Sequence, residues 1–425
     1  MKSNPVTKPR FYYGWVIVGV VALAGFTRSA ETYPVIGVFL KPMTEEFGWS
    51  RTVFSGATSA GTVLAGFLAL IFGPLIDRYD PRWILTVGFT ILGGTLVLLA
   101  MITNLWQFYV LEIIGRAVTM GVIGVALQVI IPKWFVAKRG RTVAISSLGQ
   151  RIGNTVTPLY VQLLVSTWSW RVGTVVAGLV IWILSLVPVA LFLRRRPEDM
   201  GLLPDGATPE KLEQSQDEVV SPGPLSSNQE ISFSIRQVIR LPSFYLLAAG
   251  VSIVFIALPG TTLHLIPYLT DQGLSAGVAV TIVAIYSASG GLGSLIYGFL
   301  IERYNIRLVS AGGLFLLSAG FVVLMNVQSP VLGFLWGFYQ GLLVGGFLIV
   351  QQVVFADYFG RGSLGAIRGI VWPIQMVANS IGPITAGLVY DTTGSYFPIF
   401  SAFGVLVLLS SLFVFLARPP STPHP

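Results

Sequence analysis

The chain has 425 residues and a formal net charge of +8, with 54% apolar and only 10% charged residues. About a quarter of the residues in a soluble domain are charged, so this composition has too little polar surface to coat a globule of that size. The absence of cysteine excludes disulfide scaffolds and thiolate chemistry, and two histidines are too few for a histidine-based metal centre. We therefore expect a polytopic membrane protein that carries no metal and no cofactor.

Twelve long apolar segments follow one another along the chain. Each is long enough to cross ~30 Å of hydrocarbon as a helix, and the runs lack the alternation of barrel strands. The first segment is too long for a signal peptide and is predicted to be retained. The segments lie near residues 13–39, 53–76, 83–103, 106–131, 142–165, 172–193, 244–269, 277–301, 308–326, 331–355, 367–390 and 396–416.

The distribution of Lys and Arg predicts the orientation, because cytoplasmic loops of membrane proteins carry an excess of positive charge. With the N-terminus in the cytoplasm, an even number of spans places both termini there. All but six of the 26 Lys and Arg residues then fall in cytoplasmic segments, and Lys41, Arg51 and Arg171 fall in external loops. This asymmetry predicts a multi-pass protein with cytoplasmic termini, and the expected location is the bacterial inner membrane. It also explains the basic excess without a nucleic-acid partner.

The composition changes between the sixth and seventh spans. Residues 197–230 are rich in Pro, Ser, Glu, Gln and Asp, which is typical of a flexible linker. In the stretch that follows, Ile235, Val238 and Ile239 would share one side of a helix, which favours a short interfacial helix over a solvated one. The predicted domains are a six-helix bundle in 1–196, a linker in 197–243 and a second six-helix bundle in 244–425.

The two halves repeat at an offset of 225 residues. Six helices repeated in the same direction predict a parallel repeat about an axis along the membrane normal. The expected fold is therefore an all-α membrane protein of twelve helices in two six-helix pseudo-repeats. The matching positions are Gly73–Arg82 with Gly298–Arg307, Gln150 with Gln375, Asn154 with Asn379 and Pro158 with Pro383.

These motifs give the chain a family resemblance over nearly its full length. The loop from Gly73 through Asp77 and Arg78 to Arg82 resembles the signature of the major facilitator superfamily, with Asp80 in place of a usual glycine. Tyr13-Gly14-Trp15, and Trp134-Phe135 leading through Lys138-Arg139 to Arg141, resemble the bacterial monocarboxylate and oxalate/formate transporter branch. The resemblance implies a secondary transporter that works by alternating access. No nucleophile–base arrangement indicates an enzyme.

Ionisable side chains inside the spans are candidates for function, because each costs about 2.5–3.5 kcal/mol to place in hydrocarbon. Three arginines and one glutamate in the N-terminal half leave a positive interior, and the arginine fork suits a carboxylate. We predict that Arg28 and Arg151 bind substrate. Clamping of backbone carbonyls is the alternative for each arginine. The residues are Arg28, Glu31, Arg116 and Arg151 in the N-terminal half and His264 in the C-terminal half.

Glu31 and Arg116 are predicted to take part in proton coupling. Arg28 and Glu31 lie three residues apart and could pair on one helix face. Glu31 is the one carboxylate expected deep in a span, since Glu112 is placed near the outer end of span four. A buried carboxylate can bind and release a proton, and a permanently ionised partner of Arg28 is the alternative. Arg116 also resembles the arginine of the superfamily's span-four motif, which is linked to coupling and to packing.

Neutral polar side chains complete the predicted substrate site. His264 can donate to a carboxylate or carry a proton, and satisfaction by a neighbouring carbonyl is the alternative. The anion-binding residues of the related transporters cannot be carried over, because span eight has no ionisable side chain besides two tyrosines, and Arg368 lies near the cytoplasmic end of span eleven. The other predicted substrate-binding residues are Tyr33, Tyr286, Gln340 and Gln375.

The resemblance also implies a gate on the cytoplasmic side. In this superfamily the acid of the signature loop faces the N-terminal end of a helix in the opposite half, where the helix dipole favours negative charge. Asp77 would approach the start of span eleven and Glu302 the start of span five, which would latch the outward-open state. Plain anchoring of the loops is the alternative. The predicted gating residues are Asp77, Arg78, Arg82, Glu302 and Arg303.

Together these features predict a secondary transporter of a small organic anion. A monocarboxylate is the leading substrate class, and proton symport is favoured over exchange. A drug or neutral-metabolite exporter of the same fold is one alternative. A transporter-like membrane sensor that does not transport is the other.

Overall fold

The structure, a computed structural model, describes residues 12–135, 138–206, 233–360 and 363–420 and leaves out the side chains of Asp77 and Arg139. Within these residues the chain forms twelve long helical segments and no strand. Their bounds are α1 (Gly14–Arg28) with η1 (Ser29–Glu31) and α2 (Tyr33–Phe47); α3 (Arg51–Arg78); α4 (Pro81–Leu99); α5 (Leu105–Ala117) with η2 (Val118–Ile123) and α6 (Gly124–Trp134); α7 (Arg139–Thr167); α8 (Trp170–Ile181) with η3 (Trp182–Leu186) and α9 (Val187–Phe192); α12 (Pro242–Asp271); α13 (Ala276–Arg303); α14 (Ile306–Leu324); α15 (Pro330–Phe359); α16 (Leu364–Thr393); and α17 (Phe397–Leu416). The expected all-helical fold is confirmed.

Ten of these twelve segments are long and apolar enough to cross a membrane by length and composition alone. The other two are α7 and α16, which the sequence predicts as spans five and eleven. Both carry amide side chains in mid-helix, at Gln150 and Asn154 in α7 and at Gln375 and Asn379 in α16. Polar groups at membrane depth are tolerated where they face protein or a water-filled cavity rather than lipid. These two helices are thus candidates for lining a site.

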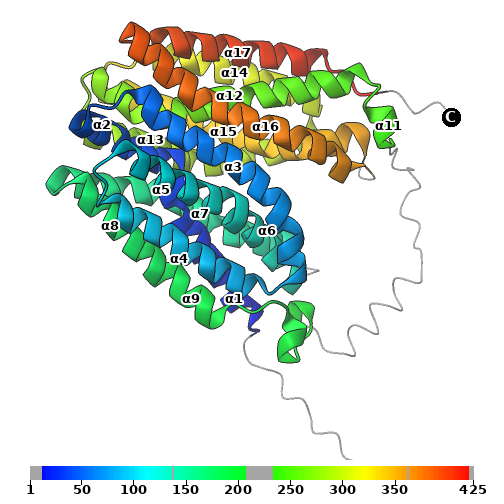
Figure 1. Cartoon of the computed structure of the whole chain (residues 1–425). Helices are drawn as coiled ribbons and strands as arrows, with labels where there is room; N and C mark the ends of the chain where they lie inside the picture. The colour runs from blue at the N-terminus through cyan, green and yellow to red at the C-terminus, as the bar shows by residue number, and fades with distance from the viewer. Residues whose placement is uncertain (1–11, 136–137, 207–232, 361–362, 421–425) are drawn as a thin grey trace, which may run out of the picture.

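The helices form two bundles that lie side by side in Figure 1, with α1–α9 in the N-terminal bundle and α12–α17 in the C-terminal bundle. The bundles meet toward the left of that view and diverge toward the right. The start of α1 and the end of α6 are joined by the Tyr12 hydroxyl, which donates to the Trp134 carbonyl at 3.0 Å. The ends of α15 and α17 are joined by the Tyr358 hydroxyl, which donates to the Ala417 carbonyl at 2.8 Å. We call the face that holds these four helix ends the terminal face, and the other the opposite face.

Local structure repeats at the offset of 225 residues that the sequence predicts. Gly48 and Gly273 both have positive φ, at 67° and 88°, and each ends a helix. Two residues later, Ser50 and Ser275 cap the next helices, α3 and α13, by accepting a backbone N–H. A glycine in the left-handed region followed by a serine N-cap is a strong signal for a turn between two helices. Few residues other than glycine adopt the positive φ, and few residues other than Ser, Thr, Asp and Asn cap a helix well. The turn is thus encoded twice.

The first span is broken at membrane depth. α1 ends at Arg28, a single 3-10 turn follows, and Thr32 is extended before α2 begins. Pro34 lies in the first turn of α2, where its ring prevents a continuous helix by clashing with the carbonyl four residues earlier. Backbone freed by such a break must be satisfied inside the protein. The Glu31 carbonyl accepts a hydrogen bond from the Arg116 guanidinium.

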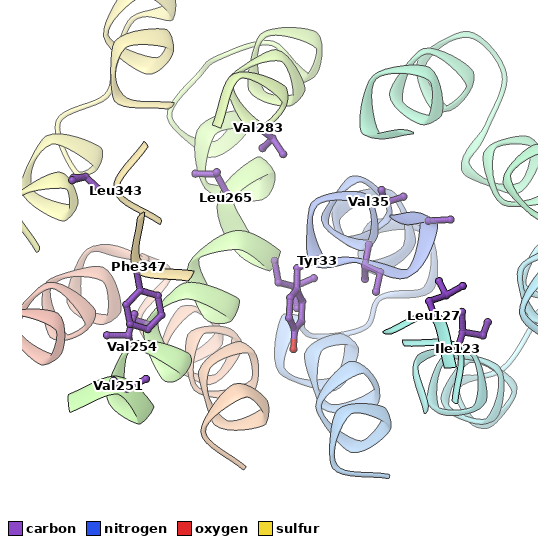
Figure 2. Close-up of a cluster of buried hydrophobic side chains, with 14 of the residues drawn as sticks. Tyr33, Val35, Ile123, Leu127, Val251, Val254, Leu265, Val283, Leu343 and Phe347 are labelled. Atoms are coloured by element: carbon purple, nitrogen blue, oxygen red, sulfur yellow. The ribbon is translucent and has the colours of Figure 1, made fainter. Parts of the chain in front are cut away.

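Apolar side chains fill both bundles and the contact between them. Figure 2 shows Tyr33 where the bundles meet, with Leu265 of the C-terminal bundle on one side and Val35 of the N-terminal bundle on the other. Leu265 is 1% exposed and Val35 is fully buried, so apolar side chains of both bundles are buried where the bundles meet.

Residues of the predicted linker are described only in part, since 207–232 lie outside the described residues. A single helical turn, α11 (Ile235–Val238), precedes α12. Val238 is buried whereas Ile239 is 40% exposed, so these two side chains do not share one face. Asp205, in the short turn η5 (Pro204–Gly206), accepts a hydrogen bond from the Lys138 N–H at the start of α7. The domain boundaries at 196 and 243 stay a prediction.

Glycines allow α13 and α15 to pack backbone against backbone. A Cβ added at Gly345 would overlap the carbonyl oxygen of Gly290, and one at Gly293 would overlap that of Leu342. Close helix approach at small residues is the usual packing device in membranes. We expect Gly345→Leu to lower the thermal stability of the detergent-purified protein sharply, because overpacking a tight contact costs about 1–3 kcal/mol or more. Gly312→Leu is the matched control, since nothing lies within 4 Å of a Cβ there. Equal melting temperatures for the two variants would contradict this packing.

Candidate functional site

A cavity of about 570 Å³ lies between the bundles on the side of the terminal face. Its walls come from α1, α6 and α7 of the N-terminal bundle and from α15 and α16 of the C-terminal bundle. Polar side chains from both bundles line it, and no Asp or Glu is among the described residues around it. The polar and charged lining residues are Arg28, Gln128, Ser146, Ser147, Gln150, Gln351, Gln352, Arg368 and Gln375.

Arg28 brings a positive charge to the cavity wall at the end of α1. Its guanidinium lies against Gly124 of α6, where a Cβ would come within 3.0 Å of Nη1. The buried Nε has no hydrogen-bond partner, and among the described residues no acid forms an ion pair with this side chain. The expected pair with Glu31 is not formed, because the break after Arg28 turns Glu31 toward α5. A charged fork without a partner, at the wall of a cavity, is poised to bind an anion.

Two glutamines at repeat-equivalent positions face this cavity from the two bundles. Gln150 of α7 packs on Gly25 of α1, and Gln375 of α16 is 2% exposed. At the cavity rim, Arg368 donates to the Gln352 carbonyl at 3.0 Å, which holds the start of α16 against the end of α15. The amides give the cavity both donors and acceptors beside the positive charge.

The opposite face is closed by charged residues that join the two bundles. Lys41 and Arg51 of the N-terminal bundle form ion pairs with Asp271 at 3.0 and 2.8 Å. Arg51 also donates to the Tyr396 hydroxyl at 2.7 Å and lies over the Tyr390 ring at 3.6 Å. We call this cluster of Lys41, Arg51, Asp271, Tyr390 and Tyr396, together with Asp391, the opposite-face latch.

Asp391 of α16 completes the latch by capping α3. Its carboxylate accepts the backbone N–H groups of Arg51 and Thr52 at 3.0 and 2.8 Å and the Thr52 hydroxyl at 2.5 Å. An acid at a helix N-terminus satisfies free N–H groups and meets the positive end of the dipole. The sequence predicts this arrangement for Asp77 and Glu302 on the terminal face. The structure shows such a cap for Asp391 on the opposite face, and the side chain of Asp77 lies outside the described residues.

His264 and Tyr33 lie within this closure and do not line the cavity. The His264 ring is fully buried and lies 3.0 Å from the Ser55 hydroxyl, 3.0 Å from the Pro383 carbonyl and 2.8 Å from the Tyr396 hydroxyl. The Tyr33 hydroxyl donates to the Asn379 side-chain oxygen at 2.5 Å and so links α2 to α16. Both side chains therefore connect the bundles in this conformation.

Glu31, Glu112 and Arg116 form a buried cluster inside the N-terminal bundle, at 3%, 4% and 1% exposure. Arg116 bonds the Glu31 carbonyl and the Thr62 hydroxyl and lies over the Tyr33 ring at 3.9 Å. The Glu112 carboxylate accepts the Thr58 hydroxyl at 2.9 Å, while Oε2 of Glu31 is buried without a partner. Glu112 is thus buried as deeply as Glu31, because α3 and α4 pack against α5 at the end of span four where the sequence places it.

Three other predicted substrate-binding residues lie outside the cavity lining. Arg151 of α7 donates to the Ser294 hydroxyl of α13 at 3.0 Å and so bridges the bundles. Tyr286 stacks on Trp336 with ring centroids 6.1 Å apart. Gln340 is 2% exposed and donates to the Leu317 carbonyl within the C-terminal bundle.

The predicted gating residues stand at helix ends of the terminal face. Glu302 and Arg303 end α13, and no ion pair of Glu302 is present among the described residues; Arg303 lies over the Phe299 ring at 4.1 Å. Arg78 ends α3, and Arg82 in the first turn of α4 lies over the Trp83 ring at 5.3 Å. The backbone of Asp77 belongs to α3, but its side chain lies outside the described part of the structure. These helix ends belong to the terminal face, and the cavity lies on the same side of the molecule.

The sequence analysis missed the opposite-face latch, although the repeat carries a signal for it. The offset of 225 that aligns the halves places Glu46 on Asp271. In the structure Glu46 pairs with Arg171 of its own bundle at 2.6 Å, whereas Asp271 pairs with Arg51 and Lys41 of the other bundle. The equivalent acids thus differ between the repeats: one pairs within its own bundle and the other pairs with the other bundle. This difference makes the closure asymmetric.

Among the described residues no cluster of three or more His, Asp or Glu could hold a metal ion.

Two bundles with a polar cavity between them, reaching one face and closed on the other, define a multi-pass membrane transporter. The sequence profile of the Major Facilitator Superfamily matches residues 17–282 and 246–425. The chain belongs to this superfamily.

Individual relatives are distant but span nearly the whole chain. Monocarboxylate transporter 12-B of Danio rerio is 24% identical, over 97% of this chain and 89% of that protein. The membrane sensor protein UhpC of Salmonella typhimurium is 26% identical, over 84% of this chain and 82% of that protein. A solved structure of a bacterial homologue of the human lysosomal transporter Spinster, inward-facing and unoccupied, has a TM-score of 0.73 at 15% identity and covers 98% of both chains. The last shows the fold alone.

Proposed function

We propose that this protein is a secondary active transporter of a small organic anion, with a monocarboxylate as the substrate class. The observation that carries the proposal is the Arg28 guanidinium, which has no ion-pair partner among the described residues and stands at the wall of a cavity whose described lining holds no Asp or Glu. A carboxylate fits a planar guanidinium through two parallel hydrogen bonds. The likeness to monocarboxylate transporters over most of the chain supports the same class.

The conformation supports alternating access. The cavity reaches the terminal face while the opposite-face latch holds the bundles together. We place the terminal face in the cytoplasm of a bacterial cell, because most of the described Lys and Arg residues outside the spans lie at its helix ends. The structure then represents an inward-facing state, and the latch is the closed external gate. Proton symport, with Glu31 and Arg116 in the coupling site, is part of the proposal.

The second candidate is a membrane sensor that binds its ligand in the same cavity without moving it. The likeness to the sensor protein UhpC favours it. The two functions differ in flux, because both bind a ligand and only a transporter carries it across. An exporter of neutral compounds would need no free guanidinium at the cavity wall.

The test begins with ligand-induced thermal stabilisation of the purified protein. Monocarboxylates, dicarboxylates and keto acids are compared with neutral and cationic drugs. A ligand at 100 times its Kd stabilises by about 2.7 kcal/mol, which is a readable shift in melting temperature. Stabilising carboxylates are then followed into proteoliposomes under an imposed proton gradient. Accumulation driven by the gradient supports the transporter, and stabilisation without flux supports the sensor. If only drugs stabilise the protein, the proposal of an anion substrate is wrong.

A further inference from the structure

Glu112 is a buried carboxylate with no role in the site described so far. It lies one helical turn before Arg116 on α5, so that the two side chains share a face. Glu31 reaches the same face from η1, and its Oε1 stands 3.1 Å from where a Cβ on Gly115 would be. Two carboxylates and one guanidinium therefore occupy one buried volume.

The charges in this volume do not balance by themselves. The negative charges of Glu31 and Glu112 repel each other, and Arg116 attracts both. With both acids ionised the three groups sum to one negative charge, which is costly in a buried site. Arg28, which repels Arg116 across the break in the first span, brings the sum to zero from the cavity wall. The remaining groups around the pair carry no charge: Tyr33 of α2, Thr58 and Thr62 of α3, and Thr95 of α4.

We propose that Glu31 and Glu112 form one proton-binding pair on Arg116, and that an anion bound at Arg28 causes this pair to take up its proton. The part of this inference that concerns anion binding at Arg28 rests on the proposed function. A carboxylate at Arg28 neutralises the charge that balanced the second acid, so the cluster and its ligand sum to one negative charge. One proton on the pair restores neutrality. Anion and proton then bind in a one-to-one ratio, and by reciprocity each favours the other.

The same cluster is connected to the contact between the bundles. Arg116 lies over the Tyr33 ring at 3.9 Å, and the Tyr33 hydroxyl bonds Asn379 of α16 at 2.5 Å. A proton on Glu31 or Glu112 weakens the electrostatic attraction between the pair and Arg116. The Arg116 guanidinium contacts Tyr33, and Tyr33 joins the two bundles. Binding of a proton by the pair therefore acts on the opposite-face closure through these two contacts, Arg116 to Tyr33 and Tyr33 to Asn379.

Infrared spectroscopy of the reconstituted protein tests the pair, because the C=O stretch of a protonated carboxylic acid is separate from the bands of a carboxylate. The variant Arg28→Gln removes the balancing charge and mimics a bound anion without any substrate. We expect the buried-acid band to titrate with a midpoint about one pH unit higher in Arg28→Gln than in the wild type. We expect Glu112→Gln, added to Arg28→Gln, to abolish the band. Glutamine keeps an oxygen for the Thr58 hydroxyl, and a melting curve verifies the fold.

Glu46→Gln is the matched control, since Glu46 is an acid of the same bundle that lies at the surface and pairs with Arg171. It should leave the band and its midpoint unchanged. A band that survives Glu112→Gln, or equal midpoints for wild type and Arg28→Gln, would overturn the pair. Carboxylates that stabilise the wild type should raise its midpoint as Arg28→Gln does. If Arg28→Gln moves the midpoint but no carboxylate does, the proton-binding pair stands and the proposed anion function fails.

Discussion

Arg28→Gln is expected to weaken carboxylate binding by about 10- to 100-fold while the unliganded protein keeps most of its stability, because a proton taken up by Glu31 and Glu112 offsets the lost charge. A hydrogen bond to a charged group is worth about 1.5–3 kcal/mol, and each 1.4 kcal/mol is tenfold in Kd. The free protein loses no partner of Arg28, because Nε is buried without one and no acid pairs with the side chain among the described residues. An arginine that clamps the structure would show the reverse: loss of stability and unchanged affinity.

Two variants make this measurement specific. Arg28→Lys keeps the charge without the planar fork and should retain part of the affinity, because a lysine binds a carboxylate as a point charge. Arg236→Gln removes a positive charge from an exposed position on α11, away from the cavity, and should bind like the wild type. Isothermal titration and melting curves on the same samples give affinity and stability together. Full affinity in Arg28→Gln would remove the central residue of the proposed site.

Arg51→Ala is expected to shift the protein away from the conformation with a closed opposite face. It removes the ion pair with Asp271 and the hydrogen bond to Tyr396 in one step, and among the described residues it leaves Lys41 as the ion-pair partner of Asp271. Breaking a partly buried pair from one side leaves the other charge desolvated. A loss of about 1.4 kcal/mol already changes the ratio of the two conformations tenfold. We expect at least this shift, with partial opening of the opposite face.

The absence of cysteine allows a direct measurement, because introduced cysteines are the sole labelling sites. Spin labels at Glu45→Cys and Gln272→Cys, both exposed next to the latch, report the distance across the opposite face. In Arg51→Ala a longer distance should gain population. Glu46→Gln breaks a more exposed ion pair that stays inside one bundle, so it should leave the distances unchanged. Identical distance distributions in the wild type and Arg51→Ala would show that the latch does not hold the face closed.

Much of the fold follows from local sequence. Hydropathy places twelve spans, and the turns are encoded by residues with a conformational reason, such as Gly48 and Gly273 at positive φ followed by Ser50 and Ser275 as caps. The repeat at 225 residues predicts the two bundles without any knowledge of packing. It also identifies Gln150 and Gln375 as equivalent, and both line the cavity. These features depend on neighbours in the chain, which the sequence contains directly.

Pairing of the charged groups was decided by tertiary structure. Spacing alone allows Arg28 to pair with Glu31, but the break before Pro34 turns the acid toward α5 and leaves the arginine at the cavity. Position along span four places Glu112 near the outside, but α3 packs over it. Each is a contact between helices, and no local periodicity specifies which helix will lie opposite a given side chain.

The sequence by itself thus determined the number, direction and repeat of the helices, and the polar character of α7 and α16. Only the tertiary structure decided which face is closed. Acids stand in the last turns of helices on both faces, at Glu302 of α13 and at Asp391 of α16, and either could cap a helix of the other bundle. In this conformation Asp391 caps α3, and Glu302 has no ion pair among the described residues. The physical reason is that the two bundles cannot bring their helix ends together on the terminal face and on the opposite face at the same time. The choice between them is a property of the whole conformation.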